Sequence, residues 1–216
     1  MNINVEDYLK NIYNIKNETG KVTNNLLADR LKITPAAVSD MVSKLSKSGY
    51  ITNKPYRGFE LTKKGEKIAI SLIRKHRLWE VFLMKYLNYH WDEVHSDAEN
   101  LEHISSEVLI SRLEKFLGNP QYDPHGDPIP DKNGKFPEYN AVPLNSIQIG
   151  ETVVIKKVSD ENSEILEYFS KLGLSLDNKI RVTEKIKFDN SVEIMHKGKK
   201  IFLSEKLSAR IYVQKK

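Results

Sequence analysis

Residues 34–61, TPAAVSDMVSKLSKSGYITNKPYRGFEL, join an amphipathic helix to two short β-like runs. Thr34 is a helix-capping residue type and Pro35 suits a first helical turn, so a helix is predicted from there to Gly49. The apolar residues that its spacing turns inward are Val38, Met41, Val42 and Leu45. The runs on either side of residues 54–58, KPYRG, predict a β-hairpin.

The residues before this stretch supply two more helices. VEDYLKNIYNIKNE, residues 5–18, has apolar positions near helical spacing, and NNLLADRLKI, residues 24–33, predicts a short helix capped by Asn24. Three helices followed by a hairpin is the element order of a winged helix-turn-helix, in which small side chains on the third helix can approach a DNA groove. The basic residues placed to reach phosphates are Lys44, Lys47, Lys54 and Arg57. A three-helix packing module with a solvated lysine face is the alternative.

Charge is segregated along the 216 residues. Residues 1–75 carry 14 Lys/Arg against 7 Asp/Glu, residues 76–140 carry 6 against 12, and residues 141–216 carry 14 against 10. A basic first third favours a polyanion partner and an acidic middle favours cations, although such differences also arise from solubility alone.

Composition also indicates the cellular compartment in which the protein is expected. There are no cysteines, which excludes disulfides and thiolate metal sites. No apolar run approaches the roughly 20 residues of a membrane span, and MNINVEDYLKNIYNI does not resemble a secretory signal. We therefore expect a cytoplasmic protein without a membrane partner.

The remaining two thirds predict a helical region and then a β-rich one. A broad apolar helix is predicted from Lys63 to about Leu87, followed by WDEVHSDAENLEHI and SSEVLISRLEKFLG as two helices with a break at Ser105 and Ser106. The broad apolar surface of such helices must be buried against other elements or a second subunit, so we expect a helical dimerisation unit. Beyond a proline-rich loop, four to five short strands and one helical segment predict a small barrel of SH3 type. The fold class is thus mainly α with a small β domain, and the predicted domains are residues 1–73, 74–140 and 141–216.

Residues 93–107, EVHSDAENLEHISSE, hold two histidines and five acidic residues without a lysine or arginine. Four of them share one helix face: His95, Glu99, Glu102 and His103. His76 and Glu80, four apart, share another face on the preceding helix. Carboxylates one turn apart repel each other unless a cation lies among them, and imidazole with carboxylate suits a divalent metal. A solvated acidic face is the alternative interpretation.

A metallohydrolase would use the same residue types, with a metal-bound water and a glutamate base. The chain has no H-E-x-x-H, no G-x-S-x-G and no phosphate-binding glycine loop. We therefore expect no enzymatic activity and no small organic substrate, and we interpret the metal as a structural or switching ligand.

Taken together, these motifs resemble the diphtheria-toxin-repressor and manganese-transport-regulator family of metal-dependent repressors, in its three-domain form. The resemblance covers essentially the whole chain, with a looser match in the C-terminal barrel, which is FeoA-like. It is carried by EDYLKNIY, TPAAVSDMVSKLSKSGYI, YRGFELTKKGEKIA, KHRLWEVFL, VHSDAENLEHISSE and PHGDPIP.

The resemblance implies two metal sites in each subunit. The family's regulatory site matches Asp7, Glu99, Glu102 and His103. Its second site matches His76, Glu80 and His95. Barrel side chains often complete the second site, and the candidates here are Asp160, Glu161 and Glu164. The implied DNA-binding residues of the recognition helix and wing are Thr34, Pro35, Ala36, Ala37, Ser39, Asp40, Lys44, Lys54 and Arg57.

The resemblance also bears on the identity of the metal. Iron-type members place a methionine and a cysteine where this chain has Asp7 and Glu99, and replacing soft sulfur by hard carboxylate favours Mn(II). Two-domain manganese regulators have a glutamate where this chain has Lys10, so two separated sites are expected here instead of a closely paired one. The implied function is a Mn(II)-dependent repressor that binds double-stranded operator DNA as a homodimer and controls metal-uptake genes. An Fe(II)-dependent repressor of iron-uptake genes and a metal-independent winged-helix regulator are the alternatives.

Overall fold

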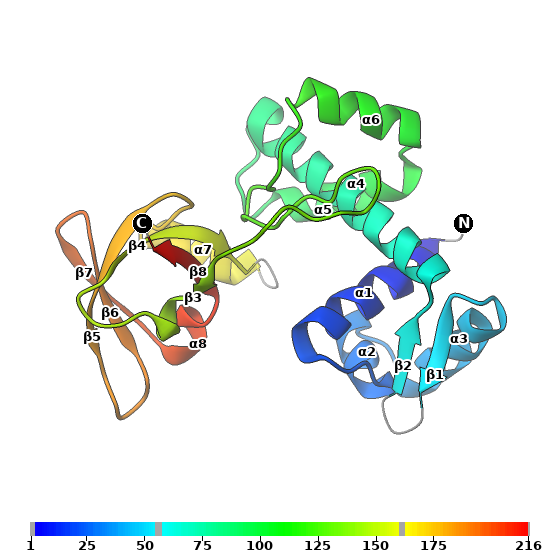
Figure 1. Cartoon of the computed structure of the whole chain (residues 1–216), viewed down its shortest axis with the longest axis horizontal. Helices are drawn as coiled ribbons and strands as arrows, with labels where there is room; N and C mark the ends of the chain where they lie inside the picture. Colours follow the sequence, from blue (N-terminus) through cyan, green and yellow to red (C-terminus); the bar gives the residue numbers. More distant parts are fainter. Residues whose placement is uncertain (1–2, 55–57, 160–162, 216) are drawn as a thin grey trace. The chain divides into compact units, whose positions relative to one another are not determined.

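The structure is a computed structural model that describes residues 3–54, 58–159 and 163–215 (Figure 1). Three of the predicted site residues, Arg57, Asp160 and Glu161, lie outside these ranges, and Lys54 is described by its main chain alone. No helix within the described ranges combines the length and the apolar composition that crossing a membrane requires.

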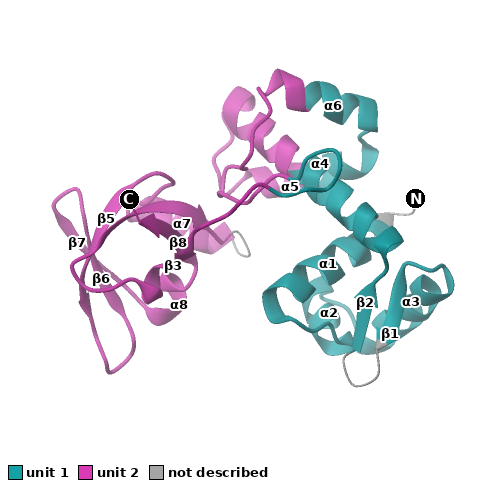
Figure 2. Ribbon diagram, viewed as in Figure 1, with its two compact units in different colours: residues 1–76, 99–113, 130–136 teal, residues 77–98, 114–129, 137–216 magenta. Residues whose placement is uncertain are grey.

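The chain divides into two compact units (Figure 2). The first comprises residues 1–76, 99–113 and 130–136, and the second comprises residues 77–98, 114–129 and 137–216. Three helices contribute residues to both units: α4 (Lys63–Leu87), α5 (Val94–Ile104) and α6 (Glu107–Phe116). The three helices predicted for this part of the sequence are present, and so is the break at Ser105 and Ser106, but α5 begins three residues later than predicted, at Val94.

The first unit contains the winged helix. Its helices are α1 (Ile3–Thr19), α2 (Asn24–Leu31) and α3 (Pro35–Lys47), and its hairpin is β1 (Ile51–Lys54) with β2 (Gly58–Leu61). The two strands pair antiparallel, with Ile51 opposite Leu61 and Lys54 opposite Gly58. The element order predicted from residues 5–61 is therefore confirmed.

Local capping explains where α2 and α3 begin. Thr34 accepts a hydrogen bond from the Ala37 amide at 3.2 Å, as expected for the residue before Pro35. The cap of α2 is Thr23, which accepts from the Leu26 amide at 3.3 Å, so the prediction of Asn24 as the cap was wrong by one residue. The three helices, the segment between α1 and α2, and the hairpin share one core, whose side chains include Leu9, Ile12, Val22, Leu27, Val38, Leu45, Ile51 and Phe59.

Gly58 brings the hairpin against the segment between α1 and α2. Its φ is +79°, and a Cβ built there would lie 1.9 Å from the Val22 carbonyl oxygen. Only glycine therefore permits this approach of the wing to the helices.

The second unit contains a six-stranded antiparallel sheet in the order β3-β8-β4-β5-β6-β7. The elements are β3 (Val142–Pro143), η1 (Leu144–Ser146), β4 (Thr152–Val158), α7 (Ser163–Lys171), β5 (Lys179–Lys185), β6 (Val192–His196), β7 (Lys199–Leu203), α8 (Glu205–Ser208) and β8 (Ile211–Lys215). Alternate strand residues such as Val153, Ile155, Ile180 and Val182 fill its core. The sequence predicted four to five strands and missed β3, because two residues are too few to show alternation.

Candidate metal centre

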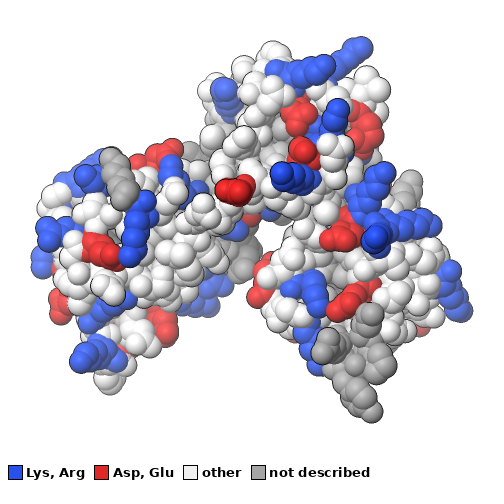
Figure 3. All heavy atoms as spheres, viewed as in Figure 1, with Lys and Arg blue, Asp and Glu red and all other residues white. Residues whose placement is uncertain are grey.

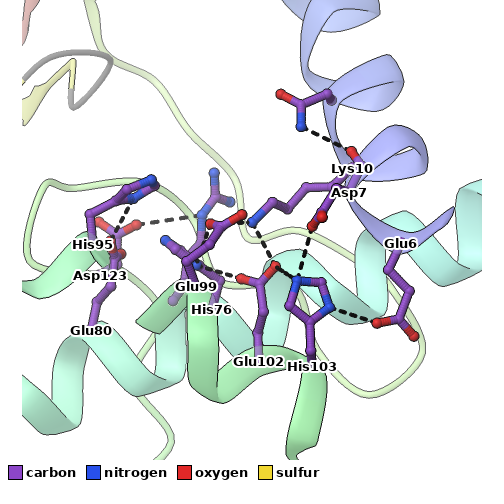
Figure 4. Close-up of polar contacts among 12 residues, drawn as sticks. Glu6, Asp7, Lys10, His76, Glu80, His95, Glu99, Glu102, His103 and Asp123 are labelled. Atoms are coloured by element: carbon purple, nitrogen blue, oxygen red, sulfur yellow. Dashed lines mark hydrogen bonds and ion pairs between the residues drawn. The ribbon is translucent and has the colours of Figure 1, made fainter. Parts of the chain in front are cut away.

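Four predicted ligands of the regulatory site come together inside the first unit. One atom from each lies within 4.8 Å of the others, and the four residues are Asp7, Glu99, Glu102 and His103, which we call the first cluster. Asp7 comes from α1, whereas the other three follow helical spacing along α5 (Figure 4). That these residues hold a metal stays a prediction; the resemblance grouped these four side chains, and the structure brings them together.

His103 is oriented by two carboxylates. Its Nδ1 lies 2.7 Å from Glu6 Oε2 and its Nε2 lies 2.9 Å from Asp7 Oδ1, with the imidazole almost fully buried. A carboxylate on one ring nitrogen commonly fixes the direction of the other toward a metal, and Glu6 occupies that position here. Glu6 was missed as a site residue; its signal was adjacency to Asp7 on the same helical turn.

The charge inside the first cluster explains why a cation fits it. Burial raises the pKa of Asp7, and the negative charges of Glu99 and Glu102 act in the same direction, opposed by His103 and Lys10. Glu102 is fully buried. Three carboxylates and an imidazole nitrogen match the donor preferences of Mn(II) and Fe(II).

Lys10 supplies positive charge to the same place. Its Nζ donates to Glu99 Oε2 at 2.7 Å and to Glu102 Oε1 at 2.6 Å. Burial lowers the pKa of Lys10, but the negative charges of Glu102 and Glu99 outweigh burial and leave that pKa raised. A cation therefore already lies between two carboxylates of the first cluster.

The residues predicted for the second site lie on α4 and α5. Oε1 of the fully buried Glu80 lies 3.7 Å from Nδ1 of the largely exposed His95. His76 precedes Glu80 by one turn of α4 and belongs to the first unit, whereas Glu80 and His95 belong to the second. His76 Nδ1 also lies 2.5 Å from Glu102 Oε2, so this imidazole contacts a first-cluster residue as well.

The structure adds two residues that sequence reasoning missed. His125 lies in the PHGDPIP stretch and Asp123 directly precedes that stretch, and both form with Glu80 a buried group whose ligand atoms are within 4.8 Å of one another. We call Glu80, Asp123 and His125 the second cluster. His125 Nε2 lies 2.6 Å from the Trp91 carbonyl oxygen and therefore donates to it, so a neutral imidazole turns its Nδ1 lone pair toward Glu80 Oε2, 3.8 Å away. Two electron-rich atoms facing each other at this separation suit a cation.

The loop that carries Asp123 and His125 is held by its own backbone and by β4. Asp123 Oδ1 accepts from the amides of His125 and Asp127 at 2.8 and 2.9 Å, and Val158 N donates to the His125 carbonyl at 2.9 Å. At Gly126 the φ is +90° and a Cβ would lie 1.9 Å from the Lys156 carbonyl oxygen. Of the three barrel candidates, Glu164 is described and lies exposed on α7.

The buried carboxyl of Asp123 predicts a pH dependence for the metal-free protein. Burial raises its pKa to about 7, helped by the negative charges of Asp127 and Glu80. The folded state therefore binds more protons than the unfolded state between about pH 4 and about pH 7, so stability falls as the pH rises across that window. We expect the melting temperature of chelator-treated protein to fall by at least about 2 °C across it.

Asp123→Asn keeps the acceptor oxygen and stays neutral, so we expect it to flatten that fall. Asp29→Asn, a change at an exposed carboxylate on α2, serves as the control and is expected to keep the wild-type slope. An unchanged slope in Asp123→Asn would show that another group titrates in this window.

The predicted DNA-binding residues form an exposed surface on α3. Thr34, Pro35, Ala36, Ala37, Ser39, Asp40 and Lys44 are all exposed. Ser39 Oγ donates to the Pro35 carbonyl at 3.0 Å and accepts from Asn24 Nδ2 at 2.7 Å, which ties the start of α3 to α2. Lys and Arg side chains are visible on the face of the molecule in Figure 3, in keeping with the net charge of +5.

Three parts of the sequence match described families. Residues 2–59 match "Iron dependent repressor, N-terminal DNA binding domain" and residues 62–131 match "Iron dependent repressor, metal binding and dimerisation domain". Residues 142–215 match "FeoA domain". The iron-dependent repressor IdeR of Mycobacterium tuberculosis is 33% identical over 176 residues, which cover 77% of this chain and 76% of that protein. The diphtheria toxin repressor of Corynebacterium diphtheriae is 29% identical over 219 residues, covering 97% and 96%.

The chain belongs to the diphtheria toxin repressor family. A solved structure titled "Manganese-dependent transcriptional repressor complex with manganese" matches this family member with a TM-score of 0.90 and 34% identity, over 98% of this chain and 100% of that one. The fold class predicted from the sequence, a winged helix-turn-helix with a helical unit and an SH3-like, FeoA-like domain, is confirmed. As a member of the diphtheria toxin repressor family, the protein is a metal-dependent transcriptional repressor.

Proposed function

We propose that Mn(II) is the physiological effector of this repressor, that it binds operator DNA as a homodimer in the cytoplasm, and that it silences metal-uptake genes. The observation that carries the proposal is the meeting of Asp7, from the winged helix, with His103 Nε2 on α5 at 2.9 Å. Through this contact the DNA-binding elements and the metal-binding helix share one site.

The proposed regulatory ligands are those of the first cluster, Asp7, Glu99, Glu102 and His103. A divalent cation bound there would supply the positive charge that these carboxylates share. Asp7 holds α1 to α5, and Leu9 of α1 and Val38 of α3 belong to the same buried core. The side chains of the first cluster thereby fix how the recognition helix is presented, and metal and DNA affinities become reciprocal.

A second metal site is proposed around Glu80. Its candidate ligands are Glu80, Asp123 and His125 of the second cluster, together with His76 and His95. The barrel residues Asp160, Glu161 and Glu164 stay candidates for completing it. Because His95 is largely exposed whereas Asp123 and His125 are buried, the buried pair is the better-protected partner for Glu80.

The donor set supports manganese over softer metals. Both clusters contain carboxylate oxygen and imidazole nitrogen, and the chain has no cysteine to offer a thiolate. The match at 34% identity to a structure titled as a manganese complex points the same way. Fe(II) is the second candidate, favoured by the 33% identity to an iron-dependent repressor.

The proposed dimer is based on exposed apolar side chains that an interface would bury. On the first unit these are Ile104, Val108 and Leu109, and on the second they are Tyr86, Leu87 and Phe116. They lie on α4, α5 and α6, within the residues that match a dimerisation domain. Large exposed apolar side chains favour a protein partner, and a second copy of the chain would bring the same set of side chains to the interface.

Retention of genomic DNA tests the proposal. Chelator-stripped protein is incubated with genomic fragments at fixed ionic strength, with Mn(II), with Fe(II) under anaerobic conditions, or with neither. We expect specific fragments to be retained with Mn(II), at an affinity at least about 10-fold above that without metal. Equal retention without metal would make the protein a metal-independent winged-helix regulator, and retention with Fe(II) alone would reassign the effector.

A further inference from the structure

Lys10 is a buried cation placed among the proposed ligands of the first cluster. Its side chain is 9% exposed, and its Nζ lies 2.7 Å from Glu99 Oε2 and 2.6 Å from Glu102 Oε1. Figure 4 shows the side chain reaching from α1 toward these two carboxylates on α5. Lysine is seldom buried unless it is paired, so the two carboxylates hold the ammonium and the ammonium cancels their mutual repulsion.

Lys10 engages an oxygen atom that a bound metal would also need. Glu102 Oε1, its acceptor, is the oxygen that lies 3.6 Å from His103 Nε2. The other oxygen, Glu102 Oε2, is 2.5 Å from His76 Nδ1. An ammonium and a divalent ion on the same buried oxygen would be like charges a few ångströms apart, which a low-dielectric site makes strongly unfavourable.

We propose that Lys10 is an internal cation that ties α1 to α5 in the metal-free protein and has to leave Glu102 when the metal binds. The inference rests on the proposed function, because it concerns the regulation of the same site. Activation is then an exchange of one cation for another. The carboxylates of the first cluster have a positive partner in both states, so their mutual repulsion is offset throughout. Since breaking the Lys10 contacts costs free energy, Lys10 lowers metal affinity and sets the metal concentration at which the repressor responds.

The proposal separates Lys10 from an ordinary structural ion pair. A structural ion pair that persists in the metal-bound state would help to hold the ligands, so removing it would weaken metal binding or leave it unchanged. A competing cation has the opposite effect on metal binding, while its removal lowers the stability of the metal-free protein in both cases. Metal affinity therefore distinguishes the two roles.

The test compares wild type with Lys10→Met and Lys10→Gln. Methionine keeps the apolar stem without the charge, and glutamine can still donate to a carboxylate if the methionine variant does not fold. The control is Lys16→Met, on the same helix, where Nζ lies 3.0 Å from Glu60 Oε1 on the surface. Mn(II) binding is measured by titration calorimetry on chelator-stripped protein, and melting temperature is measured with chelator present. The binding step that Asp7→Ala abolishes identifies the first cluster.

We expect both Lys10 variants to melt several degrees below wild type without metal, and to bind Mn(II) at the first cluster at least about 10-fold more tightly. Lys16→Met is expected to match wild type in both measurements. Wild-type or weaker Mn(II) affinity in both folded Lys10 variants, with Mn(II) bound normally by wild type, would overturn the inference and leave the proposed function standing. Failure of every protein to bind Mn(II) at the first cluster would overturn the proposed function and the inference with it.

Discussion

Replacement of Asp7 by alanine is expected to abolish metal-dependent operator binding while leaving the winged helix folded. Asp7 is half-buried, and its Oδ1 contacts His103 Nε2 at 2.9 Å, so it is the α1 contribution to the first cluster. Without it, α1 retains the contacts of Glu6 and Lys10 with α5 but no longer offers a carboxylate ligand. We expect Mn(II) affinity at the first cluster to fall by at least about 100-fold, which is a larger loss than is caused by mutating a residue that only supports a ligand.

The measurement is the ratio of operator affinities with and without Mn(II), read from fluorescence anisotropy on a retained fragment. Asp29→Ala, an exposed carboxylate of the same winged-helix unit, is the control and is expected to keep the wild-type ratio. Circular dichroism checks that both variants are folded. An Asp7→Ala protein that still needs Mn(II) to bind DNA would move the regulatory site to the second cluster.

The winged helix could be predicted because each of its signals is local. Thr34 and Pro35 mark the start of α3, and Gly58 closes the wing at a position where only glycine fits against Val22. Helical spacing likewise placed Glu99, Glu102 and His103 on one face of α5, because residues three and four apart always meet in a helix. Asp7 required the family resemblance, since no periodicity links α1 to a helix that begins near residue 94.

The positions of Asp123 and His125 could not be predicted from local sequence signals. They lie in a loop whose path is fixed by hydrogen bonds to its own backbone, by Gly126 and by β4. The contacts with β4 join segments about 30 residues apart, and such contacts leave no period in the sequence. The PHGDPIP stretch was identified as part of the resemblance, but its side chains could be assigned to Glu80 only once the loop was seen against α4.

The role of Lys10 was also beyond the sequence. A lysine one turn after Asp7 is compatible with an exposed helix face, and in the sequence it indicated only that two separated metal sites are expected instead of a closely paired one. Lys10 is buried because of how α1 packs. Leu9 and Ile12 lie in the core, and Lys10, which follows Leu9, faces α5. The two ion pairs at 2.7 and 2.6 Å therefore depend on tertiary packing and not on local pattern.

Ala36→Glu on the exposed start of α3 is expected to remove operator binding without changing metal binding. Ala36 is exposed in the first turn of α3, among the predicted DNA-binding residues. Glutamate there adds bulk where the backbone must approach the groove, and it adds a negative charge facing phosphates and base acceptors. With Mn(II) present we expect operator affinity to fall by at least about 100-fold, which corresponds to about 3 kcal/mol.

The same charge placed elsewhere separates the local effect from the overall field. Asn17→Glu, at the exposed end of α1, gives an identical net charge and is expected to weaken operator binding only slightly, with a loss that salt abolishes. Ala36→Glu should stay defective at high salt, because a side chain that blocks the groove is not screened. Calorimetry should give wild-type Mn(II) affinity for both, since neither residue belongs to the first or second cluster. Wild-type operator affinity in Ala36→Glu would mean that α3 is not the recognition helix, and the DNA-binding surface would have to be sought on the wing.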